Sequence, residues 1–173
     1  MKPYCWTTCD SPIGLIYLAT YDDKLCALTT GPRAKEQLQE HLDRIGPETQ
    51  SVESPGGLEI IKRQLFEYFD GKRQAFDLPL YLKGTPFQES VWNELLTIPF
   101  GQTISYGELA NRLNNLDGVR AVGTANGRNP ISIVVPCHRV IQANGSLGGY
   151  AGGLEIKHFL LEHEAKQTKP TLF

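Results

Sequence analysis

The stretch Ile133-Val134-Val135-Pro136-Cys137-His138-Arg139-Val140-Ile141 places a thiol and an imidazole between two aliphatic runs. Such runs are buried in folded proteins, and the proline between them interrupts regular pairing. Cys137 and His138 therefore form a candidate nucleophile beside a proton acceptor. The alternative is a structural role, because cysteine is often a small buried hydrophobe and a neighbouring histidine can be a satisfied core residue.

The composition is that of a folded globular protein, with 173 residues of which 40% are hydrophobic and 21% charged. The net charge of −2 argues against a generally basic nucleic-acid binder, so DNA contacts would have to come from a local patch. No apolar run approaches the roughly 18 residues of a membrane span, and no signal peptide is visible. We expect a cytoplasmic monomer with reduced cysteines and no membrane partner.

The first half of the chain predicts a small α/β unit. Residues 4–8, 15–20 and 25–29 have the character of strands joined by polar turns. Helices are expected from Pro32 to about Arg44 and from Leu58 to Phe69, where apolar residues recur at helical spacing. We therefore expect a support domain over residues 1–83, built on an antiparallel sheet.

The second half predicts a mostly helical domain over residues 84–173. Thr85-Pro86-Phe87-Gln88 is a capping box that opens a helix, and Ser105-Tyr106-Gly107-Glu108 has the pattern of another. Two short helices, ending near Leu113 and spanning Val119 to Asn126, are joined by an Asn/Gly turn. This order fits a helix-turn-helix in a winged-helix-like domain, whose second helix would enter DNA.

The second of these helices has small residues, including Ala121 and Gly123, that would allow close approach to another molecule, and Arg120 stands near its start. Between Ser105 and Gly145, four arginines face two acidic residues, a local charge of 4 − 2 = +2 (Arg112, Arg120, Arg128 and Arg139 against Glu108 and Asp117). A solvated helix face that happens to carry arginines is the alternative.

The last segments combine a glycine-rich loop with a helix. Residues 148–153 hold four glycines around Tyr150, so backbone N–H groups could approach a ligand, although a surface hairpin has the same pattern. A final amphipathic helix is expected from Leu154 to Glu164, with an apolar face formed by Ile156, Phe159, Leu160 and His163. Glu164 would then fold back on the core.

These motifs resemble the O6-alkylguanine-DNA alkyltransferases, most closely the bacterial stand-alone form. The likeness runs through the C-terminal half in six segments: Gly84–Gln88, Ile104–Tyr106, Arg120–Gly123, Asn129–Pro130, Ile133–Val140 and Gly149–Leu154. In the N-terminal half it is loose, resting on Asp10–Gly14 and the overall length.

The resemblance implies direct-reversal DNA repair, in which Cys137 irreversibly accepts the alkyl group and is spent after one reaction. His138 would be its base, through a water, Glu164 would orient that histidine, and Asn129 would brace the backbone leading to the cysteine. Adjacent residues on one strand point to opposite faces, so direct contact between Cys137 and His138 is not expected.

The resemblance also implies roles in binding DNA and the damaged base. Arg120 would fill the stack after nucleotide flipping, and Tyr106 would crowd the phosphate and contact the guanine. Tyr150 and the backbone at Val140 and Ala151 would line the guanine pocket. The partner implied is double-stranded DNA containing O6-alkylguanine, with O4-alkylthymine as an open second lesion.

The chain departs from the family pattern in two places. Some members carry serine where Ala151 stands, so a hydrogen bond there must come from the backbone. Some eukaryotic members bind zinc in the N-terminal domain, whereas Cys5, Cys9, Cys26 and His41 lack a second short ligand pair. We therefore predict no metal and no cofactor.

Two other function classes stay open. A DNA-binding module without chemistry, either a helix-turn-helix regulator or an alkyl-damage sensor, is one, although sensors resembling this family lack the cysteine. A cysteine hydrolase using Cys137 and His138 is the other, and it would turn over repeatedly.

Overall fold

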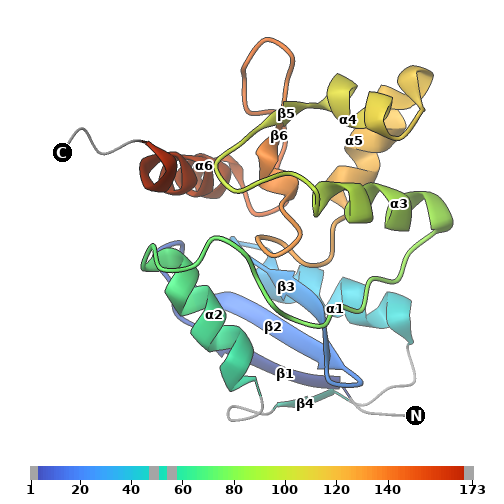
Figure 1. Cartoon of the computed structure of the whole chain (residues 1–173). Helices are drawn as coiled ribbons and strands as arrows, with labels where there is room; N and C mark the ends of the chain where they lie inside the picture. Colours follow the sequence, from blue (N-terminus) through green and yellow to red (C-terminus); the bar gives the residue numbers. More distant parts are fainter. Residues whose placement is uncertain (1–3, 47–50, 54–57, 170–173) are drawn as a thin grey trace.

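Figure 1 shows the chain as a computed structural model, with a sheet-containing N-terminal half below a mainly helical C-terminal half. The structure describes residues 4–46, 51–53 and 58–169. The predicted fold class, a small α/β domain followed by a mostly helical one, is confirmed. Within those ranges no helix has both the length and the apolar character needed to cross a membrane.

The sheet begins with the predicted antiparallel meander of β1 (Tyr4–Cys9), β2 (Ile16–Tyr21) and β3 (Lys24–Thr29). The turn between β2 and β3 consists of Asp22 and Asp23, whose φ angles are 52° and 61°. Positive φ at both central residues matches the twist of a two-residue hairpin, and aspartate tolerates it better than most residues.

A fourth strand was not predicted. Strand β4 (Ser51–Glu53) pairs in parallel with β1 and completes the order β3-β2-β1-β4. The expectation of a wholly antiparallel sheet is therefore wrong at this edge. Three residues are too few to show an alternating pattern, and Val52 is 48% exposed, so no buried apolar residue marked the strand.

Two helices cover opposite faces of the sheet, and Figure 1 shows α2 in front of it and α1 behind. Helix α1 (Ala34–Ile45) buries Leu38 and Leu42 in one apolar cluster with β-strand residues, and α2 (Glu59–Phe69) belongs to a second, larger cluster. The first helix was predicted to begin at Pro32. It begins two residues later, after a turn that the Ala34 N–H closes onto the Gly31 carbonyl.

The C-terminal half opens with α3 (Pro86–Leu95), whose capping box forms as predicted. The Gln88 N–H donates to Thr85 Oγ1 over 3.2 Å, and the Thr85 N–H donates to Gln88 Oε1 over 3.0 Å. Both ends of the motif are therefore satisfied.

Next come β5 (Ile104–Ser105), α4 (Tyr106–Arg112), the 3-10 helix η1 (Leu116–Gly118) and α5 (Val119–Gly127). The predicted second capping box forms only in part: Ser105 caps the Glu108 N–H, but the Glu108 carboxylate pairs with Arg112 one turn along the helix. Two short helices joined by a turn are thus present as predicted.

The chain ends with the 3-10 helix η2 (Cys137–Arg139), β6 (Val140–Ile141) and α6 (Leu154–Thr168). Strand β6 pairs in parallel with β5. Helix α6 continues past its predicted end at Glu164. Of its predicted apolar face, Leu160 is buried, and Ile156 and Phe159 pack half-buried against the larger cluster. Lys157 and Glu164, which are at most 1% exposed, are also buried but were not predicted in that face.

The edge of β3 carries two sets of backbone hydrogen bonds. Leu25 donates its N–H to Pro79 and accepts from Tyr81, which both lie in the N-terminal half. Leu28 donates to Pro130 and accepts from Ser132, and these two bonds join the halves. The larger apolar cluster continues across this seam, joining sheet residues such as Leu18 to residues of the C-terminal helices. The segment that leads to Cys137 is therefore hydrogen-bonded directly to the N-terminal sheet.

Candidate active site

Cys137 lies on η2, directly after a buried turn. The Val135 N–H closes this turn onto the Ile131 carbonyl over 3.0 Å, and Ile133 within it has φ 71°. A buried β-branched residue rarely adopts positive φ, so the surrounding packing has to hold the turn. The assumption that Cys137 and His138 share a strand is wrong, because the chain turns tightly at both residues.

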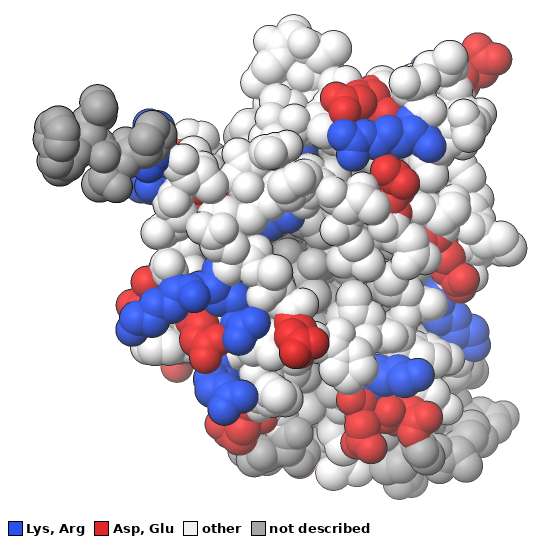
Figure 2. Space-filling model, viewed as in Figure 1, with Lys and Arg blue, Asp and Glu red and all other residues white. Residues whose placement is uncertain are grey.

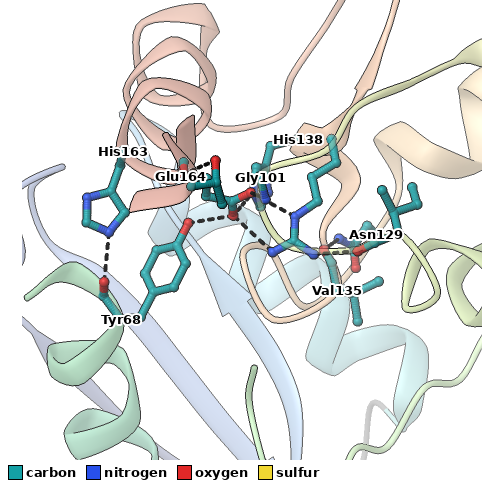
Figure 3. Close-up of polar contacts among 10 residues, drawn as sticks. Tyr68, Gly101, Asn129, Val135, His138, His163 and Glu164 are labelled. Carbon is teal, nitrogen blue, oxygen red and sulfur yellow. Dashed lines mark hydrogen bonds and ion pairs between the residues drawn. The ribbon is translucent and has the colours of Figure 1, made fainter. Parts of the chain in front are cut away.

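The side chain of Asn129 braces this turn from inside. Its Nδ2 donates to the Val135 carbonyl over 2.7 Å, and its Oδ1 accepts from the Ile131 N–H over 3.0 Å. Asn129 is 4% exposed, so the two bonds satisfy backbone groups that water does not reach. Figure 3 shows Asn129 beside Val135 at one end of the polar network.

His138 and Glu164 form a buried pair between η2 and α6, as Figure 3 shows. His138 Nε2 lies 2.7 Å from Glu164 Oε1, and the two side chains are 0% and 1% exposed. The other ring nitrogen, Nδ1, is buried and has no hydrogen-bond partner among the described residues. With the proton on Nε2, Nδ1 has a free lone pair that can accept a proton.

Glu164 accepts four further hydrogen bonds. Tyr68 and Gly101 donate over 2.9 and 3.1 Å, and Arg139 donates from two nitrogens over 2.9 and 3.0 Å. Burial alone would raise the pKa of Glu164, but His138 and Arg139 outweigh it and hold that pKa well below its usual range. Glu164 is therefore a carboxylate.

The pKa of His138 is lowered, first by burial and further by the positive charges of Arg139 and Lys157, while Glu164 acts in the opposite direction. Burial raises the pKa of the Cys137 thiol, and the Asn129 amide and the Lys157 ammonium counteract it. The resting pair is therefore a neutral thiol and a neutral imidazole, so a proton has to move before sulfur can act as a nucleophile.

Lys157 is a site residue that the sequence analysis missed. Its side chain is 0% exposed, and Nζ donates to the carbonyls of Val140, Leu147 and Gly149. Burial lowers the pKa of Lys157 to about 8, against the influence of Cys137. Lysine is almost never fully buried without partners, and here it ties the loop after β6 to α6.

A hollow of about 450 Å³ is lined by four of the predicted binding residues, Tyr106, Arg120, Gly123 and Tyr150. Burial is the main cause that raises the pKa of Tyr106 and of Tyr150, and a negative charge on Cys137 would raise both further. The volume falls within the range of small-ligand sites.

The remaining predicted binding residues lie outside the lining of that hollow. Ala121 is exposed on α5. The Val140 carbonyl accepts from Lys157, and the Ala151 carbonyl accepts from Gln37 of α1 over 3.2 Å. Asn126 was not predicted as a site residue, but it lines the hollow and is 4% exposed. Its Oδ1 has no hydrogen-bond partner among the described residues.

The expected basic patch is smaller than the count of arginines suggested. Arg139 is buried against Glu164, and Arg112 pairs with Glu108 and Glu94. Arg120 and Arg128 are exposed and form no ion pair within the described part of the chain. Figure 2 shows basic groups with acidic groups close by on the face that it presents. Counting charges along the sequence cannot separate a buried arginine from a solvated one.

The other candidate ligands do not converge. Cys5 and Cys9 are half-buried, Cys26 is buried, and all four cysteines are free thiols. In the ranges that the structure describes, no three His, Cys, Asp or Glu side chains lie together as a metal site would require.

A buried cysteine, a histidine held by a carboxylate and a hollow lined by two tyrosines define a thiol-nucleophile protein, here with a two-helix unit at the rim of the hollow. The chain belongs to the 6-O-methylguanine DNA methyltransferase family. That family's ribonuclease-like domain matches residues 4–82, and its DNA binding domain matches residues 86–166.

Several relatives have a similar sequence along almost the whole chain. The methylated-DNA–protein-cysteine methyltransferase of Mycobacterium bovis is 45% identical over 96% of both chains. The constitutive enzyme of that name from Bacillus subtilis is 43% identical over 92% of this chain and 94% of its own.

Solved structures agree with these relatives. The crystal structure of Mycobacterium tuberculosis O6-methylguanine methyltransferase has a TM-score of 0.83 and 43% identity, covering 99% of this chain and 98% of its own. Mycobacterium tuberculosis OGT in complex with DNA has the same TM-score and 44% identity, covering 96% of both chains.

Proposed function

We propose that this protein repairs DNA by direct reversal, moving an alkyl group from O6 of guanine to Sγ of Cys137 once per molecule. The observation that carries the proposal is the buried thiol beside His138, whose Nε2 is held 2.7 Å from the Glu164 carboxylate. The shared family and the names of the relatives support the same reaction.

The reaction balances without a further reactant. The Cys137 proton passes through a water to His138 Nδ1, and Glu164 stabilises the imidazolium that forms. The thiolate attacks the alkyl carbon, so that an S–C bond forms as the C–O6 bond breaks. The guanine takes up the proton, and a thioether remains on Cys137. Water does not cleave a thioether, and so each chain reacts once.

The target nucleotide has to leave the DNA stack, because a buried sulfur cannot reach a base inside a duplex. We assign the flipped guanine to the hollow between Tyr106 and Tyr150. Arg120, at the rim, would fill the gap in the stack. Val140 and Ala151 would offer backbone groups to the base.

We assign DNA binding to α4 and α5 as a helix-turn-helix within a C-terminal domain of residues 84–173, with residues 1–83 as the support domain. The small residues Ala121 and Gly123 on α5 would allow the helix to lie close in the minor groove. The separate family matches over 4–82 and 86–166 support this division, although residues 1–3 and 170–173 lie outside the described ranges. The free thiols fit a protein that acts on DNA in the reducing cytoplasm. We propose that it acts as a monomer.

An oligonucleotide duplex with one O6-methylguanine tests the proposal. Intact-protein mass spectrometry should show a single methyl adduct, and peptide mapping should place it on Cys137. Cys5, Cys9 and Cys26 serve as internal controls, because they are free thiols and the buried His138–Glu164 pair lies next to Cys137 in the structure. Cys137→Ala should bind the duplex and gain no adduct.

The same experiment separates the other function classes. DNA binding without any adduct on the wild-type protein would indicate a damage sensor or a regulator. Repeated product formation per molecule would indicate a cysteine hydrolase. The same assay with O4-methylthymine tests the second lesion.

A further inference from the structure

Tyr68 links the N-terminal domain to the reactive pair. It lies on α2, 96 residues from Glu164 in sequence, and its hydroxyl donates to Glu164 Oε1 over 2.9 Å. Tyr68 is 0% exposed. It is the one N-terminal side chain among the described residues that hydrogen-bonds to this carboxylate.

The position of Tyr68 is fixed from both ends. Its backbone carbonyl lies 2.7 Å from His163 Nε2, so α2 and α6 are joined by hydrogen bonds at Glu164 and at the preceding residue. Its ring contacts those of His163, Phe76 and Phe100, with centroids 5.1, 5.4 and 6.1 Å away. Figure 3 shows the phenol pointing from α2 to Glu164. The hydroxyl cannot leave the carboxylate without repacking this cluster.

Three donors share Glu164 Oε1. They are His138 Nε2 at 2.7 Å, Tyr68 at 2.9 Å and Arg139 at 3.0 Å, whereas Oε2 accepts from Arg139 and Gly101. A carboxylate oxygen has about two lone-pair directions. A third donor therefore draws away electron density that would otherwise strengthen the bond to His138.

We propose that Tyr68 is a positioning residue that orients Glu164 and limits how strongly this carboxylate stabilises the His138 imidazolium. The inference rests on the proposed alkyl transfer to Cys137. It gives the N-terminal domain a part in the reaction, because a group of that domain adjusts the base of the C-terminal domain.

Tyr68 suits this role because it is neutral. Burial, with Glu164 as the next cause, raises the pKa of Tyr68 well above its usual value, so the phenol keeps its proton and only donates. The charged groups acting on His138 are Glu164 and Lys157 of α6 and Arg139 of η2. The titratable thiol of Cys137 belongs to the residue before His138 in η2. The phenol of Tyr68 reaches Glu164 from α2.

The test is the Tyr68→Phe variant, which removes one hydroxyl and keeps the ring. The rate constant for Cys137 alkylation by free O6-benzylguanine is measured against pH, because the free base avoids any effect on DNA binding. With Oε1 shared by fewer donors, the His138 imidazolium becomes more stable. The acidic limb of the rate profile should shift to higher pH by roughly 0.5 unit, which is the size expected on removing a neutral hydrogen bond.

Tyr4→Phe is the matched control. Tyr4 is also buried in the N-terminal half, at 1% exposure, and its hydroxyl donates to the Leu42 carbonyl at the far side of the sheet. This variant should lose stability as Tyr68→Phe does and leave the midpoint of the profile unchanged. An equal shift in both variants would indicate a general effect of destabilisation and overturn the inference.

An unchanged midpoint in folded Tyr68→Phe would also overturn it. If the wild-type protein gains no adduct on Cys137, the proposed function fails, and this inference fails with it. If Tyr68→Phe does not fold, 3-fluorotyrosine placed at residue 68 keeps the hydroxyl and strengthens it as a donor. The limb should then move to lower pH, and a limb that stays in place would count against the inference.

Discussion

The Lys157 ammonium lies 2.7 Å from the Val140 carbonyl, three residues beyond Cys137 in sequence. The same Nζ donates to Leu147 and Gly149, at the start of the glycine-rich loop. One buried cation therefore holds both ends of the segment between η2 and that loop. Its charge also favours the thiolate form of Cys137.

Lys157→Met should destabilise the fold by about 2–4 kcal/mol, because three backbone carbonyls lose a charged donor. It should also slow alkylation of Cys137 about tenfold at neutral pH, since the thiol pKa rises when the ammonium that lowers it is removed. The wild-type ammonium loses its proton as pH rises through about 8, so the difference should narrow above that pH. Chemical denaturation and single-turnover rates measure both effects. An equal rate deficit at all pH values would exclude the electrostatic role.

Asn129→Ala should lower the free energy of unfolding by about 2–4 kcal/mol, because the Val135 carbonyl and the Ile131 N–H become unsatisfied in the core. Asn129→Asp keeps the acceptor for Ile131 and loses the donor. Its negative charge should raise the thiol pKa, so it should react more slowly with O6-benzylguanine than its stability predicts. Equal rates for the Asn129→Asp variant and the wild-type protein would contradict this electrostatic effect, whereas an unchanged free energy of unfolding in Asn129→Ala would contradict the bracing role.

Arg120→Ala should slow repair of duplex DNA at least tenfold, which corresponds to about 1.4 kcal/mol of the cost of unstacking a base. Reaction with free O6-benzylguanine should change by less than about twofold, since no stack has to be filled. Arg128→Ala is the control, because Arg128 is the other exposed arginine without an ion pair near α5. Arg128→Ala should weaken DNA binding in a salt-dependent way. It should not slow the repair of bound duplex DNA more than the reaction with free O6-benzylguanine.

Gly123→Ala should have opposite effects on stability and on DNA binding. A Cβ at Gly123 would meet the Tyr106 ring at 3.6 Å, an ordinary contact, and helix propensity favours alanine by about 0.5–1 kcal/mol. The variant should therefore melt at a higher temperature. Its affinity for duplex DNA should fall, because the added methyl group lies on the face that we assign to the groove. An increased affinity of Gly123→Ala for duplex DNA would contradict the assignment of this face of α5 to the groove.

His41→Gln tests acid stability away from the site. Burial, together with Arg44, lowers the pKa of His41 to about 4 from its ordinary 6.5. Between these values the unfolded chain binds a proton that the folded chain does not, so wild-type stability should fall as pH falls from 6.5 to 4. The variant should lose less stability across that window in urea titrations. A parallel loss in both proteins would refute the buried-histidine explanation.

Local patterns predicted much of the fold. The capping box at Thr85 and the Asp22–Asp23 turn are encoded by adjacent residues, and both form. Strand β4 has no such local signal, because it depends on pairing with β1. The positive φ of Ile133 is equally invisible in sequence, since packing enforces it against the preference of an isoleucine.

The site residues also differ in whether they could be predicted from the sequence. Cys137 and His138 are adjacent and could be found from their types, whereas Tyr68 reaches Glu164 across 96 residues. Lys157 did leave a signal: with Leu160 and Glu164 it forms an i, i+3, i+7 stripe on α6. Charged residues on a stripe that also holds leucine indicate either an exposed face or a buried polar site. Only the tertiary contacts distinguish these two cases.

The hydrogen bonds between Leu28 and the residues on either side of Ile131 make the β3 edge a reference for the position of the nucleophile. A slip of one residue along β3 would displace the Cys137 turn by about 3.3 Å and reverse the faces of its side chains. Helices α4 and α5 contribute none of these bonds. Changes in α4 and α5, the segment to which we assign DNA binding, are therefore compatible with an unchanged position of the Cys137 sulfur.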